Sequence, residues 1–401
     1  MTHCSPSRRL LVARSGHAAR VLTRLVLLPL ALAALTAAAT AAPGATTVAP
    51  VTAAAAIAPA TTVGPAAVRH VFVINLENKG FTKTFGASSP ATYLNHTLRP
   101  AGALLTQYYG VAHNSLPNYL AQISGQAPNP QTQADCQIYS DFVAPGPAVA
   151  PQQIVGNGCV YPANVKTLPD QLTAKGLTWK GYMQDMALGG GTGTCEHPVL
   201  GTRDGTQQAT PTDQYAVRHN PFVYFHSIID SPACARNDVD LTALPHDLAS
   251  VATTANVNFI TPNLCNDGHD APCADGRPGG LVSIDAWLKS WVPKIQASPA
   301  YKKDGLIVIT FDESDSPQTD STACCGETAG PNSPLPGITG PGGGRVGAVL
   351  LSRWIRPGTT TTTPYNHYSL LASIEDTFGL SRLGYASTVP HTFGRDVYTA
   401  P

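Results

Sequence analysis

Four short runs of mostly apolar residues constrain the fold of this chain more than any other feature. They lie at residues 68–75, 257–261, 306–311 and 346–351. Each run is largely continuous rather than alternating with polar residues, which is typical of strands in a parallel sheet covered on both faces. Helices are predicted between them, at 117–124, 282–295 and 369–378. The sequence therefore predicts an α/β doubly wound fold, with a mainly parallel sheet, helices on both faces and one large domain.

Acids, amides and histidines gather directly after three of these runs. They are Glu77 and Asn78 after the first, Asn263, Asp267, His269 and Asp270 after the next, and Asp312, Glu313 and Asp315 after the third. In such sheets, functional residues lie just past the carboxyl ends of the strands. Carboxylate, amide and imidazole groups are ligands for divalent metal ions, and His367 would add another. The pattern predicts a metal site; the alternative is that each acidic loop is simply solvated.

One serine is placed to act as a nucleophile. Ser115 stands just before the helix predicted from Pro117, and a helix amino end favours an anion through its free N–H groups and partial positive charge. A divalent metal ion would lower the pKa of such a hydroxyl and stabilise a phosphoryl group under attack. The alternative is that Ser115 or Asn114 only caps the helix. The sequence contains no GxSxG, P-loop or HExxH motif.

The amino-terminal residues have the features of a secretory signal peptide followed by a linker. Five arginines precede an apolar run at 25–35, and the small-x-small pattern Ala39-Thr40-Ala41 follows. Residues 1–41 are therefore predicted to be a signal peptide, because the run is shorter than the ~20 residues of a membrane span. A retained anchor is the alternative. The Ala/Pro/Thr-rich residues 42–67 predict a linker, and residues 68–401 the folded domain.

Cysteine usage agrees with export. Cys4 would leave with the signal peptide, and the eight other cysteines predict up to four disulfides in a secreted protein. Cys265 and Cys273 are expected to close a local loop. The adjacent Cys324 and Cys325 are expected to bond to different partners. No CxxC pair is present, which argues against a structural zinc site.

The charge balance argues against nucleic acid as a partner. The chain has 25 basic and 25 acidic residues, and removing the signal peptide leaves 20 basic residues against 25 acidic ones. Binding to a phosphate backbone needs clustered Lys and Arg. No basic amphipathic helix is visible either, so stable membrane insertion is not expected.

Several motifs occur in order between residues 68 and 385. They are His70–Asn78, Ser115–Ala121 with Ser124–Gly125, Trp179–Asp185, Arg218–Phe222, Pro262–Asp270, Thr310–Glu313 and Asn366–Ser369. Together they resemble the bacterial phosphoesterases of the alkaline phosphatase superfamily, the group of secreted acid phosphatases and phospholipases C. The acid phosphatase branch is the most similar. Gln184 and Gly268 depart from the family pattern, which more usually has Glu and Met there.

The resemblance implies roles for individual residues. Ser115 would be the nucleophile. The implied cofactor is one or more divalent metal ions, whose number and identity the resemblance leaves open. The implied metal ligands are Glu77, Asn78, Asp312, Glu313, Asp267, His269 and His367, of which the last three could instead contact the phosphate. The implied substrate-binding residues are Asn118, Arg218, His219, Asn263 and Asp270.

The function implied is that of a secreted, metal-dependent phosphomonoesterase of acid phosphatase type, working through a phosphoserine intermediate. Its substrate would be a small phosphate ester or a phosphoinositide headgroup. One alternative is a phospholipase C or another phosphodiesterase, and another is a non-catalytic secreted binding protein on the same fold. A sulfatase is disfavoured, because Tyr119 stands where the sulfatase nucleophile segment needs Arg.

Overall fold

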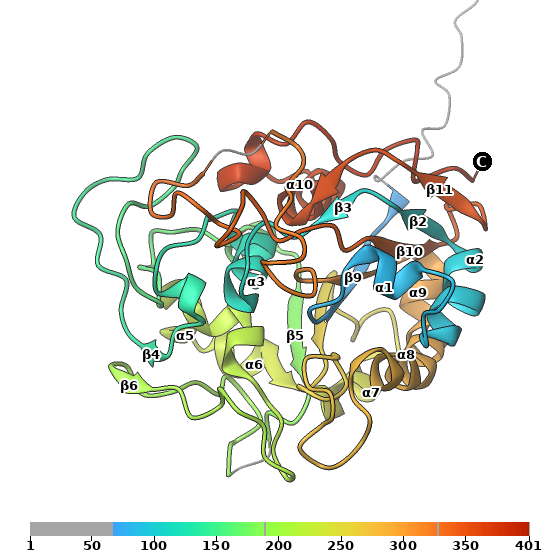
Figure 1. The fold of residues 1–401 in the computed structure, drawn as a ribbon, viewed down its shortest axis with the longest axis horizontal. Helices are drawn as coiled ribbons and strands as arrows, with labels where there is room; N and C mark the ends of the chain where they lie inside the picture. The colour runs from blue at the N-terminus through green and yellow to red at the C-terminus, as the bar shows by residue number, and fades with distance from the viewer. Residues whose placement is uncertain (1–66, 188–189, 327–328, 401) are drawn as a thin grey trace, which may run out of the picture. The chain divides into compact units, whose positions relative to one another are not determined.

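The computed structural model describes residues 67–187, 190–326 and 329–400. Among these residues, eight strands form one sheet in the order β11-β2-β10-β9-β1-β8-β5-β7 (Figure 1). The strands are β1 (His70–Leu76), β2 (Ala103–Leu105), β5 (Trp179–Met183), β7 (Asp238–Asp240), β8 (Val257–Thr261), β9 (Gly305–Phe311), β10 (Ala348–Ser352) and β11 (Thr359–Thr361). Two small sheets pair β3 (Tyr108–Tyr109) with β12 (Tyr365–Asn366), and β4 (Ile138–Tyr139) with β6 (Thr202–Arg203).

The centre of the sheet is parallel, as predicted. β1 runs parallel to β8 and to β9, with Ile74 beside Ile260 on one side and Ile309 on the other. All seven residues of β1 are buried, which explains why its sequence does not alternate. β10, predicted from the run at 346–351, instead runs antiparallel to both β9 and β2. The apolar pattern reports burial on two faces and carries no information on strand direction.

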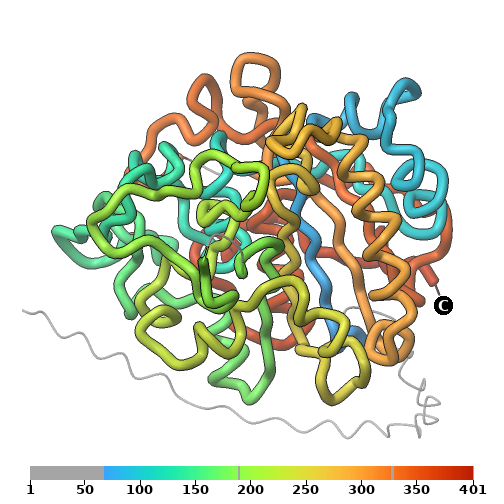
Figure 2. The backbone as a smooth tube through the Cα atoms, turned by 90° about the horizontal axis from the view of Figure 1, so that it is seen from below, coloured from blue at the N-terminus to red at the C-terminus, as the bar shows by residue number. Residues whose placement is uncertain are grey.

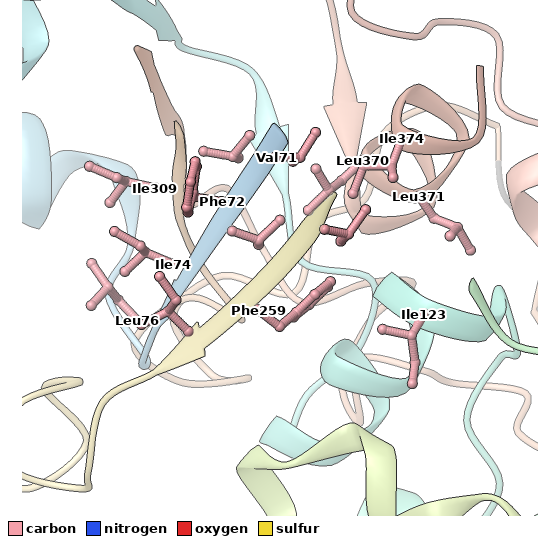
Figure 3. Close-up of a cluster of buried hydrophobic side chains, with 14 of the residues drawn as sticks. Val71, Phe72, Ile74, Leu76, Ile123, Phe259, Ile309, Leu370, Leu371 and Ile374 are labelled. Carbon is pink, nitrogen blue, oxygen red and sulfur yellow. The ribbon is translucent and has the colours of Figure 1, made fainter. Parts of the chain in front are cut away.

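Helices cover both faces of this sheet. On one side, α3 (Ser115–Ser124) and α10 (His367–Phe378) pack over β1 and β8, where Figure 3 shows Ile123, Leu370 and Phe259 pointing into a shared core. Ile74 and Leu76 project to the other side of β1. There lie α8 (Gly280–Ala297) and the shorter α9 (Pro299–Asp304) (Figure 2). The three predicted helices are therefore confirmed, each beginning two residues earlier than expected.

Shorter elements fill the connections. The remaining α-helices are α1 (Phe81–Phe85), α2 (Arg99–Ala101), α4 (Leu168–Ala174), α5 (His226–Ile229), α6 (Ala233–Asn237) and α7 (Leu244–Asp247). A short π-helix spans Leu94–Leu98, and 3-10 helices span Thr132–Ala134, Val217–His219, Pro221–Tyr224, Leu241–Ala243 and Gly384–Ser387. None of the described helices is long and apolar enough to cross a membrane.

Among the residues that the structure describes, four disulfides fix the loops. They join Cys136 to Cys159, Cys195 to Cys234, Cys265 to Cys273, and Cys324 to Cys325. The local loop closed by Cys265 and Cys273 is confirmed. The expectation that Cys324 and Cys325 reach different partners is wrong, because the chain turns at Cys325, with a φ of 72°, and the two cysteines bond to each other. The predicted signal peptide and all but the last residue of the predicted linker lie outside the described residues.

Candidate active site

Three strand ends meet at one edge of the sheet. The turn after β1 carries Glu77 and Asn78, the loop after β8 carries Asp267, and Asp312 follows β9. Backbone bonds join them, because Glu77 N donates to Asp267 O at 2.8 Å and Asp312 N donates to Leu76 O at 2.9 Å. The predicted convergence of these acids is therefore seen in the structure.

Ser115, the first residue of α3, points at this cluster. Its hydroxyl donates to Glu77 Oε2 at 2.8 Å, and the residue is 2% exposed. Neither Ser115 nor Asn114 caps the helix through its side chain. Asp135 takes that part by accepting a bond from Leu116 N at 2.9 Å. The Ser115 hydroxyl is therefore free of a capping role and is directed at a carboxylate.

Tyr119 and His219 line the same cluster. Tyr119 lies one turn after Ser115 on α3, donates its hydroxyl to Glu77 Oε1 at 2.5 Å, and stacks on His219 with ring centroids 5.3 Å apart. His219 Nδ1 lies 3.1 Å from Asp267 Oδ2, which leaves Nε2 facing Glu77 Oε1 at 3.5 Å. Ligand atoms of Glu77, His219 and Asp267 all lie within 4.8 Å of one another. His219, expected to bind substrate, thus lies among the carboxylates, where it could also hold a metal ion.

The buried acids at this edge repel one another. Burial, and then the charges of Asp312 and Asp267, raise the pKa of Glu77 well above its usual value. Burial also raises the pKa of Asp267, and it raises that of Asp312 to about 6. Burial lowers the pKa of His219, which keeps its ring neutral and able to act as a ligand. Such a group of buried carboxylates favours the binding of a further cation.

Three buried atoms in the cluster have no hydrogen-bond partner. They are His219 Nε2, Asp312 Oδ2 and Asn78 Oδ1. Each has a free lone pair, and buried acceptors of this kind are rarely left unpaired in native proteins. With Glu77 and Asp267, they form a nitrogen and oxygen donor set suited to a divalent metal ion.

Glu313 is held between two side chains. Its Oε1 accepts a bond from Asn78 Nδ2 at 2.9 Å, and its Oε2 contacts His113 Nδ1. His113 is fully buried, and its Nε2 lies 2.9 Å from the backbone oxygen of Asp320. Burial raises the pKa of Glu313 and lowers that of His113. The sequence predicted Glu313 as a metal ligand, whereas in the structure both of its oxygens already have protein partners.

His367 lies behind the cluster, at the start of α10. Its Nε2 is 2.6 Å from the backbone oxygen of Asp312, and its Nδ1 is 3.1 Å from the hydroxyl of Tyr108. Burial lowers the pKa of His367 to about 4, so the ring is neutral. Both nitrogens are engaged, and the residue holds the end of β9 in place.

Arg218, His269 and Asp270 form the outer side of the site. Arg218 is buried, and its Nη2 donates to His269 Nε2 at 3.2 Å. His269 also has its Nδ1 2.8 Å from Asp270 Oδ1, while its backbone N–H donates to Asp267 Oδ1. These three predicted residues are therefore adjacent to the cluster, with His269 exposed to solvent.

Two predicted substrate-binding residues shape loops. Asn118 accepts bonds from Val111 N and Ala112 N and donates to Ala112 O and Asn114 O, which uses its whole amide. Asn263 donates to Asp185 and accepts from Asn266 N. Asn118 holds the chain before Ser115, and Asn263 holds the loop that carries Asp267.

Sequence reasoning assigned no role to three residues that contact the site. Tyr119 could have been found, because a spacing of four places it on the same helix face as Ser115. His113 lies two residues before Ser115, and no feature of the sequence distinguished it. Asp135 reaches the helix from a loop, and no spacing rule connects it to Leu116.

Comparisons with known proteins bear on this site. The Phosphoesterase family model matches residues 90–381. Phosphate-repressible acid phosphatase from Penicillium chrysogenum is 28% identical over 72% of this chain and 54% of its own length. Acid phosphatase from Aspergillus fumigatus is 28% identical over 72% and 51%. The chain thus spans about half the length of these two fungal relatives.

A bacterial relative matches over more of its length. Phosphatidylinositol-3-phosphatase from Mycobacterium tuberculosis is 26% identical over 80% of each chain. Among solved structures, a protein in the alkaline phosphatase superfamily from Vibrio parahaemolyticus has a TM-score of 0.43 at 11% identity, covering 79% of this chain and 67% of that one. A sulfatase from Pseudoalteromonas sp. has a TM-score of 0.44 at 13% identity, covering 78% and 68%.

Proposed function

Because the chain belongs to the Phosphoesterase family, we propose that it is a secreted, metal-dependent phosphomonoesterase of acid phosphatase type that works through a phosphoserine intermediate. One observation carries the proposal. The Ser115 hydroxyl, at the amino end of α3, lies 2.8 Å from Glu77 inside a cluster of buried carboxylates. A buried serine aimed at such a cluster is suited to nucleophilic attack on a phosphate ester.

The residues present fit a divalent metal ion. Glu77, Asp267 and His219 would hold it, together with the unpaired oxygens of Asn78 and Asp312. Bound there, the ion would offset the repulsion between the carboxylates and stabilise negative charge on the phosphoryl oxygens. Glu313, His269 and His367, also predicted as ligands, surround this set.

The chain's own residues account for the covalent chemistry. Glu77 Oε2 is placed to take the Ser115 proton while a bond forms between Oγ and phosphorus. The bond from phosphorus to the ester oxygen breaks, and the alcohol leaves with the proton that Glu77 took from Ser115. Water then attacks the phosphoserine and gives a proton to Glu77, the bond from phosphorus to Oγ breaks, and Glu77 returns that proton to Ser115 as inorganic phosphate leaves. Arg218 and His269, at the outer side, are suited to hold phosphate oxygens.

The substrate we propose is a phosphate monoester, either a small soluble ester or a phosphoinositide headgroup. The fungal acid phosphatases support the first and the mycobacterial phosphatidylinositol-3-phosphatase the second. The four disulfides support an extracellular location, because disulfides persist in oxidising compartments.

Phosphate release by the purified full chain tests the proposal. We would compare p-nitrophenyl phosphate with bis-p-nitrophenyl phosphate from pH 4 to 9, with and without a chelator. Ser115→Ala should abolish turnover, whereas Ser381→Ala, at an exposed serine, should not change it. Monoester turnover that is lost with the chelator and with Ser115→Ala would support the proposal. Preference for the diester would indicate a phospholipase C or related phosphodiesterase. Turnover of neither ester, with divalent metals added, would contradict the small-ester substrate and leave a phosphoinositide phosphatase or a binding protein.

A further inference from the structure

We propose that His113, two residues before the nucleophile, is a positioning residue that acts through Glu313 to turn the amide oxygen of Asn78 toward the metal-binding cluster. The inference rests on the proposed function, in which Asn78 supplies an oxygen ligand. It assigns Glu313 to the support of that ligand rather than to the metal ion.

The first step concerns the orientation of the Asn78 amide. The oxygen and nitrogen ends of such an amide have nearly the same shape, so its orientation depends on its partners. Only the nitrogen end can donate to a carboxylate, and Asn78 Nδ2 donates to Glu313 Oε1 at 2.9 Å. Oδ1 must then point elsewhere, and it is buried without a partner. The opposite orientation would place N–H groups where a cation is expected.

The backbone of Asn78 is held as firmly as its side chain. Its N–H donates to Asp312 Oδ1 at 2.9 Å, and its φ of 47° lies in the left-handed region, which Asn tolerates better than most residues. Oδ1 is therefore the one side-chain polar atom of Asn78 left without a partner, and it is an oxygen acceptor. A hard oxygen donor beside Glu77 and Asp267 suits a divalent metal ion.

The second step concerns what holds Glu313 in place. Its second oxygen contacts His113 Nδ1, and His113 Nε2 lies 2.9 Å from the backbone oxygen of Asp320. A carbonyl oxygen can only accept, so Nε2 carries a proton and donates it. Nδ1 and Oε2 then share one further proton, whichever atom holds it. The pair made by His113 and Glu313 is therefore neutral as a unit.

A set of substitutions follows from these contacts. His113→Phe removes the support of Glu313, and Glu313→Ala removes the acceptor for Asn78 Nδ2. Each should weaken divalent metal binding by about 10- to 100-fold, the usual effect of losing a residue that orients a ligand. Glu313→Gln keeps an oxygen for Asn78 and an N–H for His113. Its metal affinity should be at least about 10-fold tighter than that of Glu313→Ala. His113→Asn keeps a polar atom near the Nδ1 position and should be intermediate.

Metal binding would be measured on the full chain by calorimetry with Mn²⁺ and Zn²⁺, in a Ser115→Ala background, so that the readout does not depend on turnover. Circular dichroism would confirm that each variant is folded, and His391→Phe, at an exposed histidine, is the matched control. A double-mutant cycle isolates the route through Asn78. In an Asn78→Ala background, His113→Phe should cause less than about a 3-fold further loss.

Each outcome decides the proposal. Weak binding by His113→Phe and Glu313→Ala, tighter binding by Glu313→Gln, and a coupled cycle would support it. Equal damage from Glu313→Gln and Glu313→Ala would overturn it and identify the Glu313 charge as a metal ligand. Additive losses in the cycle, or no metal binding by the parent chain, would also overturn it. Metal binding without phosphate release would contradict the proposed function and leave the positioning role standing.

Discussion

Lys79 follows Glu77 and Asn78 in the turn after β1, and its ammonium is buried. Nζ donates to Gly268 O at 2.9 Å, to Asn78 O at 3.2 Å and to Glu77 O at 3.4 Å. It thereby ties the turn after β1 to the loop after β8. Burial lowers the pKa of Lys79, which is the cost of placing the charge there.

Lys79→Met should therefore destabilise the protein. The substitution leaves buried carbonyl oxygens without a donor. Losing a buried hydrogen-bond partner lowers the free energy of unfolding by about 1–3 kcal/mol. Urea unfolding followed by circular dichroism measures the change. Lys83→Met is the control, because Lys83 is exposed and its ion pair with Asp315 should contribute at most about 1 kcal/mol. Equal effects of the two substitutions would contradict the tie assigned to Lys79.

The Tyr119 hydroxyl is predicted to matter for turnover more than for folding. Tyr119→Phe keeps the stacking on His219 and removes only the bond to Glu77. Bonds to charged groups contribute about 1.5–3 kcal/mol, so kcat should fall by roughly 10- to 100-fold. Tyr182→Phe is the matched control, since it removes a buried hydroxyl bonded to Asp247 away from the site. Steady-state kinetics on a phosphate monoester would show a similar kcat for both variants if the assignment is wrong.

At this scale, the sequence predicted which residues converge but not which atoms are free. Strand ends placed Glu77, Asp267 and Asp312 together, and the helix start placed Ser115 beside them. Asn118 belongs to the same motif, yet its amide is used entirely by the backbone of residues 111–114. Such local bonding depends on loop geometry, and no spacing in the sequence encodes it.

At the scale of elements, α3 carries Ser115, and both ends of the helix are fixed by contacts with other parts of the chain. Asp135 caps its start, and Gly125 ends it in the left-handed conformation, with a φ of 67°. The carbonyl of Gly125 accepts bonds from Tyr385 N and Gln153 Nε2. A Cβ at Gly125 would clash with the backbone oxygen of Leu383.

Gly125→Ala should lower stability and, by shifting α3, lower turnover as well. The left-handed conformation alone costs a non-glycine residue about 1 kcal/mol or more, and the clash adds to it. Gly176→Ala separates the backbone contribution from the clash. Gly176 also has a left-handed φ, of 72°, but open space surrounds its Cβ position, so this substitution adds no clash. Unfolding in urea should show a larger loss for Gly125→Ala than for Gly176→Ala. Equal losses would mean that the chain near Leu383 moves aside freely.

Element types were easier to predict than their directions. The four apolar runs and the three helices are present, because burial on two faces and the helical pattern are both written in local sequence. β10 runs antiparallel, and β2, β7 and β11 are only three residues long, too short to leave a pattern. Direction and edge pairing depend on contacts between distant segments, which local sequence does not show.

At the scale of the whole molecule, the sequence predicted up to four disulfides but, of their pairings, only the local one between Cys265 and Cys273. The partners Cys195 and Cys234 are 39 residues apart, and only the folded chain brings them together. The bond between Cys324 and Cys325 depends on a turn that the sequence does not announce. Disulfide pairing between distant cysteines thus depends on the complete fold.

The stability of the whole molecule should depend on pH through Glu375, which lies on α10 away from the site. Burial raises the pKa of Glu375 to about 8, above the value near 4.3 of an unfolded chain. The folded state therefore binds the Glu375 proton more tightly than the unfolded chain does. The stability gained from this proton is fully present below about pH 4 and is lost as the pH rises through 8. Glu375→Gln keeps an acceptor for Leu383 N and removes the titration. We would measure the free energy of unfolding in urea at pH 5 and at pH 8. Relative to the parent, that of the variant should rise between these two pH values by an amount on the order of a few kcal/mol. Parallel pH profiles for the two proteins would show instead that Glu375 ionises in the folded state without cost.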